Sequence, residues 1–138
     1  MSGSRTVELD IPQGQAVQAV TAALAQQGVG VLTTIDVRAT PKAKLDVDVE
    51  DYVILGACNP PLAHWALEAE LELGALLPCN VVVFTEGGAT HVSAVSAGQM
   101  LGMVGNPDLE PVAREGGERL GRVLERVRRG GERPGPRG

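Results

Sequence analysis

The sequence of 138 residues has the length of one domain, and its 43% hydrophobic and 21% charged residues are the proportions of a globular protein rather than a disordered chain. With one Phe, one Tyr and one Trp, the core must be aliphatic, and the aromatic stacking platform of a protein that binds single-stranded nucleic acid is not expected. Residues 1–113 carry four basic and thirteen acidic side chains, which excludes a basic, duplex-binding body and predicts no nucleic-acid partner.

The remaining charge lies at the C-terminal end, where residues 114–138 carry eight Arg and four Glu. We interpret these arginines as complementing the dipole at the end of a helix and solvating a tail. No run of eighteen apolar residues is present, so no membrane association is expected. The first ten residues lack a basic segment followed by an apolar one, so we predict a cytoplasmic protein whose cysteines are thiols.

The first half of the chain alternates between strand and helix patterns. Apolar residues up to Leu24 recur with helical spacing, and Gly28 is placed to end that helix in a left-handed turn. Alternating β-branched residues then indicate a second strand, and a Thr-Pro pair after it predicts a short helical turn. The expected elements are a strand at Arg5–Leu9, a helix at Gln13–Gln27, a strand at Val29–Val37 and a turn at Pro41–Leu45.

The second half begins with a compact apolar strand and ends with the strongest periodic pattern of the chain. Asn59-Pro60 and Asn106-Pro107 each combine a helix cap with proline at the first helical position, so each predicts a helix start. Two short strand patterns flank Glu86–Gly88, which suits a hairpin loop. The expected elements are strands at Tyr52–Ala57, Val81–Phe84 and His91–Val95, a helix from Pro60 to about Ala69, and a five-turn helix from Leu109 to Val127.

This order predicts an α+β fold with the sequence β-α-β-β-β-β-α. One hairpin and few crossovers favour a mostly antiparallel sheet, with the helices on one face in a two-layer sandwich. We expect a single α+β domain over residues 1–129, followed by a disordered tail rich in Gly, Pro and Arg at residues 130–138.

The two cysteines of the chain both stand at element boundaries. Cys58 directly precedes the predicted cap Asn59, where backbone N–H groups and the helix dipole would lower the pKa of a thiol that points at them. The alternative interpretation is that Cys58 is a small apolar residue at the end of a buried strand. Cys79 follows Pro78 and precedes the strand that begins at Val81, so the two thiols could meet at one end of the sheet and form a reversible disulfide if their Cα atoms lie within about 7 Å.

Other kinds of site are not supported by the sequence. Cys58, Cys79, His64 and His91 do not have the close spacing of a zinc site, so we expect no metal. The acidic stretch around Asp48 lacks the glycine and terminal glutamate of a calcium loop. No phosphate-binding or dinucleotide-binding glycine motif is present, and we expect no cofactor.

The stretch from Tyr52 to Val83 resembles domain-of-unknown-function family 302, a family of small bacterial and archaeal proteins, and the resemblance extends over about residues 5–128. It implies a domain grouped with the TATA-binding-protein-like folds, often dimeric. It implies no catalytic residues, because the activity of the family is not established. The segments that carry it are Gly28–Leu45, Gly56–Pro60, Ala63–Leu67 and Leu77–Asn80, and the positions that match the family signature are Cys58, Asn59, Pro60, Pro78, Cys79 and Asn80.

Two functional hypotheses follow. The first is a small binding or accessory module, homodimeric, with a small-molecule ligand at the Cys58/Cys79 corner or in the groove between the sheet and the long C-terminal helix. The alternative is a thiol-dependent redox or sulfur-transfer protein that uses Cys58 with Cys79 as the resolving partner. A purely structural subunit is a third reading, and it predicts an apolar surface that becomes covered in a complex.

Overall fold

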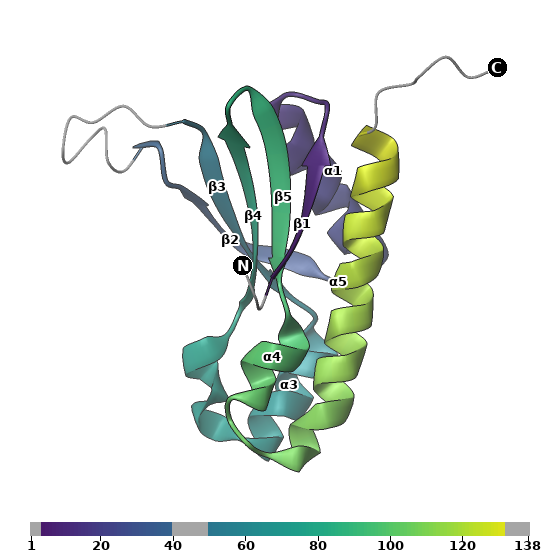
Figure 1. Ribbon diagram of the computed structural model, residues 1–138. Coiled ribbons are helices and arrows are strands. Elements are labelled where there is room, and N and C mark those ends of the chain that lie inside the picture. The colour runs from purple at the N-terminus through teal and green to yellow at the C-terminus, as the bar shows by residue number, and fades with distance from the viewer. Residues whose placement is uncertain (1–3, 40–49, 132–138) are drawn as a thin grey trace.

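The computed structural model describes residues 4–39 and 50–131. Its centre is a five-stranded sheet with the order β1-β5-β4-β3-β2, in which every neighbouring pair is antiparallel (Figure 1). The two strands of the predicted hairpin are joined by Gly87 and Gly88, whose φ angles of 59° and 84° suit the tight two-residue turn. The strands are β1 Ser4–Leu9, β2 Gly30–Asp36, β3 Tyr52–Cys58, β4 Cys79–Glu86 and β5 Ala89–Val95.

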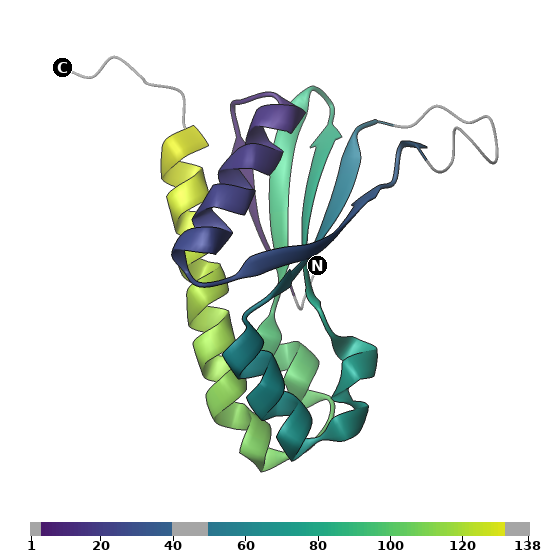
Figure 2. The ribbon, with the colours of Figure 1, turned by 180° about the vertical axis from the view of Figure 1, so that it is seen from behind.

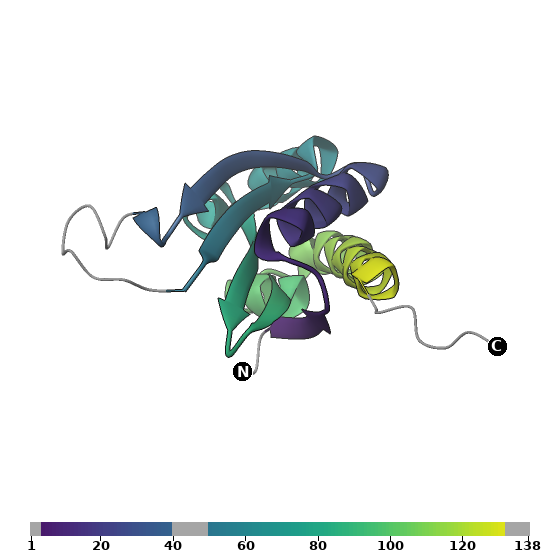
Figure 3. The ribbon, with the colours of Figure 1, turned by 90° about the horizontal axis from the view of Figure 1, so that it is seen from above.

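Two helices, α1 (Gln13–Gln26) and α5 (Glu110–Gly131), cover one face of this sheet (Figures 2 and 3). The predicted α+β sandwich with helices on one face is therefore confirmed. Its core is aliphatic, as the composition predicts, because alternate strand residues and the apolar stripes of the helices meet between the layers. The largest fully buried side chains of this core are Val20, Leu24, Leu55, Val81, Val83, Val92 and Val123.

A second, smaller unit extends beyond the end of the sheet (Figure 1). It consists of α3 (Pro60–Ala69), the 3-10 helix η1 (Leu71–Leu76), α4 (Ala97–Gly102), the 3-10 turn η2 (Pro107–Leu109) and the first turn of α5. We call residues 60–76 and 97–112 the helical lobe, and the sheet with α1 and the rest of α5 the sheet lobe. The helical lobe has its own buried cluster, formed by Ala66, Leu73, Leu101, Leu109 and Val112.

The predicted helix starts are confirmed by their capping bonds. Asn59 Oδ1 accepts a hydrogen bond from the backbone N–H of Leu62 at 3.0 Å, and Asn106 Oδ1 accepts one from Asp108 at 3.0 Å. The short helix α4 is not among the predicted elements. It is capped by Ser96, but its six residues are too few for a periodic pattern to stand out in the sequence.

The remaining sequence predictions concern the C-terminal end of α5 and segments that lie outside the described residues. Helix α5 continues through Gly131, so it includes the first two residues that the sequence assigned to the tail. The turn predicted at Pro41–Leu45, most of the acidic stretch around Asp48 and residues 132–138 lie outside the described residues. No helix in the described part of the chain has the length and hydropathy to cross a membrane.

Candidate functional site

One cavity lies at the seam between the two lobes, where the ends of β3 and β4 meet α3, α4 and α5. Its volume is about 70 Å³, and its lining is overwhelmingly apolar. Residues of both buried clusters contribute to it, so the cavity is the space that the two cores leave where they meet. Small side chains and one helical glycine make the room, among them Ala57, Ala63, Ala66, Ala97 and Gly116.

Both cysteines line this cavity. In the β3–β4 ladder Cys79 stands opposite Ala57, and Cys58 is the next residue along β3. Both are free thiols and both are half-buried. The structure thus brings together the two positions that the sequence named, and it merges the cysteine corner and the sheet–helix groove into one site.

The pKa values of both thiols are raised, whereas a thiol that pointed at the N-terminus of α3 would have a lowered pKa. Burial raises the pKa of Cys58 above its ordinary value of 9.0, because a buried thiolate loses hydration. Burial likewise raises the pKa of Cys79, and the neighbouring Cys58 raises it further, since two thiolates would repel each other. The side chain of Asn59 already occupies the N–H of Leu62 at that helix end. Both cysteines are therefore held as neutral thiols at pH 7.

Asn59 does more than cap α3. Its Nδ2 donates to the backbone carbonyl of Gly28 at 2.7 Å, while Oδ1 serves the cap. Gly28, with φ of 69°, is the left-handed residue that ends α1 as predicted. One amide side chain therefore joins the start of the helical lobe to the turn between α1 and β2, which fixes one wall of the cavity.

Arg119 of α5 is the charged residue of the lining, and the sequence reasoning did not identify it. Its Nε donates to Glu115 at 2.8 Å, and its Nη1 donates to the carbonyl of Gln27 at 2.6 Å. The sequence signal for Arg119 is its spacing of four residues from Glu115, which indicates an ion pair on a helix. That spacing also occurs in ordinary surface pairs, so it does not mark a site. Arg119 and Asn59 thus bind two successive carbonyls at the end of α1, so both are already engaged and leave an apolar cavity.

The other signature positions take structural places. Pro78, which follows a cis peptide bond with Leu77, lines the cavity. Pro60 occupies the first turn of α3 and is exposed, and Asn80 is an exposed residue of β4 opposite Gly56. Pro60 and Asn80 are therefore not part of the cavity.

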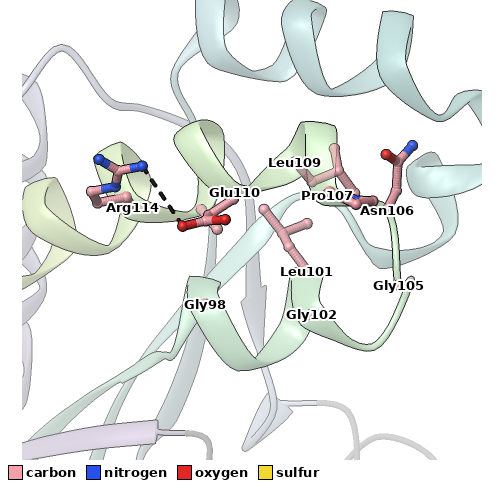
Figure 4. Close-up of a pocket in the computed structure, with 10 residues that line it drawn as sticks. Gly98, Leu101, Gly102, Gly105, Asn106, Pro107, Leu109, Glu110 and Arg114 are labelled. Atoms are coloured by element: carbon pink, nitrogen blue, oxygen red, sulfur yellow. Dashed lines mark ion pairs between the residues drawn. The ribbon is translucent and has the colours of Figure 1, made fainter.

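A wider and more open hollow, of about 530 Å³, lies between α4 and the start of α5 (Figure 4). Glycines at 98, 102 and 105 form much of its wall. Its charged side chains are Glu110 and Arg114, both exposed and 3.9 Å apart, so they largely offset each other. Because this hollow is more open to solvent than the seam cavity, it is a weaker candidate.

Within residues 4–39 and 50–131, no three His, Cys, Asp or Glu side chains lie close enough together to hold a metal ion. His64, named in the sequence as a ligand candidate, instead contacts Glu68 of the same helix at 2.6 Å and is exposed. His91 stacks on Phe84 and lies on the sheet.

Comparisons with known proteins agree with this architecture. The sequence pattern of a family described as "Domain of unknown function DUF302" matches residues 5–127. The chain is also similar to the crystal structure of an uncharacterized conserved protein DUF302 from Bacillus stearothermophilus, with 30% sequence identity and a TM-score of 0.87. That similarity covers 93% of this chain and 100% of the other. No curated protein matches the sequence significantly.

Proposed function

Because the chain belongs to the DUF302 family, whose function is not known, we propose from its site that it is a small homodimeric binding module that holds a small apolar molecule in the seam cavity. The observation that carries this proposal is a half-open apolar cavity between two separately packed cores. Protein interiors are close-packed, so a space of about 70 Å³ at a seam is a feature that needs an occupant or a reason.

The chemistry of the lining defines the class of ligand. Asn59 Nδ2 and Arg119 Nη1 bind the end of α1, Asn59 Oδ1 caps α3, Arg119 Nε binds Glu115, and the two thiols are neutral. The rest of the lining offers a ligand aliphatic surface and two polarizable sulfur atoms. The volume is below that of a drug-sized pocket, which is about 300–1,000 Å³, so the ligand is a small apolar molecule or one apolar group of a larger one.

The thiol-dependent alternative is favoured by the presence of both free cysteines in one cavity. It is opposed by their raised pKa values, because the thiolate is the reactive form in redox exchange and sulfur transfer. We therefore rank binding first and assign the cysteines the role of cavity wall.

Two adjacent glycines of α5 provide a matched test. A Cβ at Gly116 would lie 3.7 Å from the Cβ of Ala97 and inside the cavity lining, whereas a Cβ at Gly117 meets nothing within 4 Å. Both changes to Ala raise helix propensity by about 1 kcal/mol. We expect both variants to be more stable, and only Gly116→Ala to weaken the binding of small apolar probes.

The measurement is a thermal-shift and ligand-observed NMR screen with benzene, indole and a series of short alkanols. We expect wild type and Gly117→Ala to bind the same probes and Gly116→Ala to bind them several-fold more weakly. Equal binding by all three proteins would place the site elsewhere. No binding by any of them would contradict the proposed function.

A further inference from the structure

Two side chains that line the seam cavity keep hydrogen-bond donors unused. Arg119 donates through Nε to Glu115 and through Nη1 to the carbonyl of Gln27, and it makes no other bond to the residues that the structure describes. Asn59 Nδ2 donates once, to the carbonyl of Gly28. A guanidinium carries N–H groups on all three nitrogens, and an amide nitrogen carries two. Arg119 Nη2 and one N–H of Asn59 Nδ2 are therefore available to a ligand.

The nitrogens of these two side chains converge on one small space beside Gly28. A Cβ at Gly28 would lie 3.1 Å from Arg119 Nη1 and 3.3 Å from Asn59 Nδ2. Both groups are already oriented, because Arg119 is bound to the end of α1 and Asn59 caps α3. In the described part of the chain every buried side-chain nitrogen and oxygen has a hydrogen-bond partner, so the unbonded Arg119 Nη2 lies within reach of a ligand. A ligand oxygen at this corner would meet donors that need no rearrangement.

The charge of the lining favours an oxygen that is not ionised. Arg119 is the charged residue among those that line the cavity, and Glu115 balances its charge with an oxygen 2.8 Å from Nε. An anion bound here would be close to the Glu115 carboxylate and would exchange its hydration for an apolar lining. The net charge of −5 also repels anions from the protein as a whole. An uncharged carbonyl oxygen can accept the same N–H groups at a much smaller desolvation cost.

We propose that the ligand of the seam cavity is a small apolar molecule with one uncharged acceptor oxygen, as in a ketone or an ester. The free N–H groups of Arg119 and Asn59 bind this oxygen, and the carbon chain of the ligand lies against the aliphatic lining and the two sulfur atoms. This inference rests on the proposed function. It adds the polar end of the ligand and the two residues that orient it.

Three probes of nearly the same shape test the acceptor oxygen. They are methyl propyl ketone, the alkene in which a methylene group replaces the ketone oxygen, and butanoate, in which a charged oxygen replaces the methyl group beside the carbonyl. Ligand-observed NMR with the full chain gives the dissociation constant of each probe. We expect wild type to bind the ketone more than about tenfold more tightly than butanoate, because the apolar lining does not replace the hydration of an anion.

The alkene separates the hydrogen bond from the apolar contacts. Arg119→Met removes the N–H groups and keeps an apolar side chain. We expect it to lower the affinity for the ketone relative to the alkene by about tenfold, because a hydrogen bond to a charged donor is lost. The matched control is Arg114→Met. Arg114 also pairs with a glutamate four residues earlier on α5, but it lies outside the seam cavity, so we expect the wild-type ratio.

A second pair of variants tests the charge and leaves Arg119 in place. Glu115→Gln removes the carboxylate that balances Arg119, so we expect the affinity for butanoate to rise several-fold relative to the ketone. Glu110→Gln makes the same change of charge on the same helix, outside the seam cavity. We expect this control to keep the ketone-to-butanoate ratio of wild type.

The inference is overturned if butanoate binds wild type as tightly as the ketone does. It is also overturned if Arg119→Met leaves the ketone-to-alkene ratio unchanged, or if Arg114→Met lowers this ratio equally. Should circular dichroism show that Arg119→Met is unfolded, the glutamate pair decides, and equal butanoate binding by Glu115→Gln and Glu110→Gln counts against the inference. Tight binding of the alkene together with any of these results leaves the proposed function standing. Failure of all three probes to bind wild type contradicts the proposed function itself.

Discussion

The sheet lobe and the helical lobe are stabilised in different ways. The sheet lobe buries sixteen hydrophobic residues in one cluster between five strands and two helices, whereas the helical lobe buries five. In the helical lobe, side chains also bind backbone groups at the ends of the elements. Asn106, for example, caps η2 and also donates to the carbonyl of Ala69 at 3.2 Å.

The two lobes are therefore expected to unfold locally at different free-energy costs. Buried apolar area provides most of the folding free energy, so the larger cluster should set the global stability. The smaller cluster should open first and at lower cost. Because the seam cavity is built from both lobes, such an opening would also be the route by which a ligand enters.

The largest effect is expected from two leucines with the same exposure of 1%, Leu55 in the sheet lobe and Leu73 in the helical lobe. Each change to Ala removes buried carbon atoms at a cost of about 2–5 kcal/mol. We expect Leu55→Ala to lower the global free energy of unfolding in urea by that amount. Leu73→Ala should instead act mainly on the hydrogen-exchange protection of α3 and α4. Equal losses of protection in both lobes would show that they unfold as one unit.

A somewhat smaller effect is expected at Gly56, where the lobes join. A Cβ at this position would overlap Thr33 Oγ1 and lie 2.8 Å from Pro78 Cγ. Gly56→Ala therefore overpacks the junction of three strands, and we expect a loss of about 1–3 kcal/mol in urea denaturation. Gly30→Ala is the control, because a Cβ there meets nothing within 4 Å. Equal stability of the two variants would mean that the strands shift freely at the seam.

A third prediction separates the two bonds of Asn59. Asn59→Ala removes both the cap and the bond to Gly28, and we expect it to cost about 1–2 kcal/mol. Asn59→Asp keeps an oxygen for the cap but loses the Nδ2 donor, so its loss should be smaller. Chemical denaturation gives both values. If Asn59→Asp is as unstable as Asn59→Ala, the tether to the sheet lobe matters more than the cap.

The smallest effect concerns the cysteines at high pH. Their folded-state pKa values are raised, so the folded protein holds these protons more tightly than the unfolded chain does. The resulting stabilisation is complete below the ordinary thiol pKa of 9.0 and is lost as the pH rises through the raised values. Above pH 9 we expect the free energy of unfolding to fall more steeply for wild type than for Cys58→Ala/Cys79→Ala.

Iodoacetamide provides the direct reactivity check for the same thiols. We expect Cys58 and Cys79 to react more slowly in the folded protein than in urea, because burial disfavours the thiolate. Faster alkylation in the folded protein would return the thiol-dependent alternative to first place.

Much of the sheet lobe could be predicted from periodicity. Alternation located β2, short apolar runs located β3 and β4, and the helical spacing from Leu109 to Val127 located α5. These patterns arise because each element buries its apolar residues in one large core. The caps Asn59 and Asn106 could also be predicted, because a cap is a local interaction within three residues. The short helix α4 was missed, because its burial depends on neighbours far away in the sequence.

The order of the strands and main helices, the α+β class and the helix starts could therefore be predicted from local patterns, because they depend on residues near one another in the chain. Other features could be seen only in the folded molecule. Cys58 and Cys79 line one cavity as neutral thiols, and Arg119 binds the end of α1. Tyr52 and Phe84 stack on the sheet face that points away from α1 and α5. These features depend on strand order and on how two lobes pack. Such long-range contacts leave no periodic trace in the sequence.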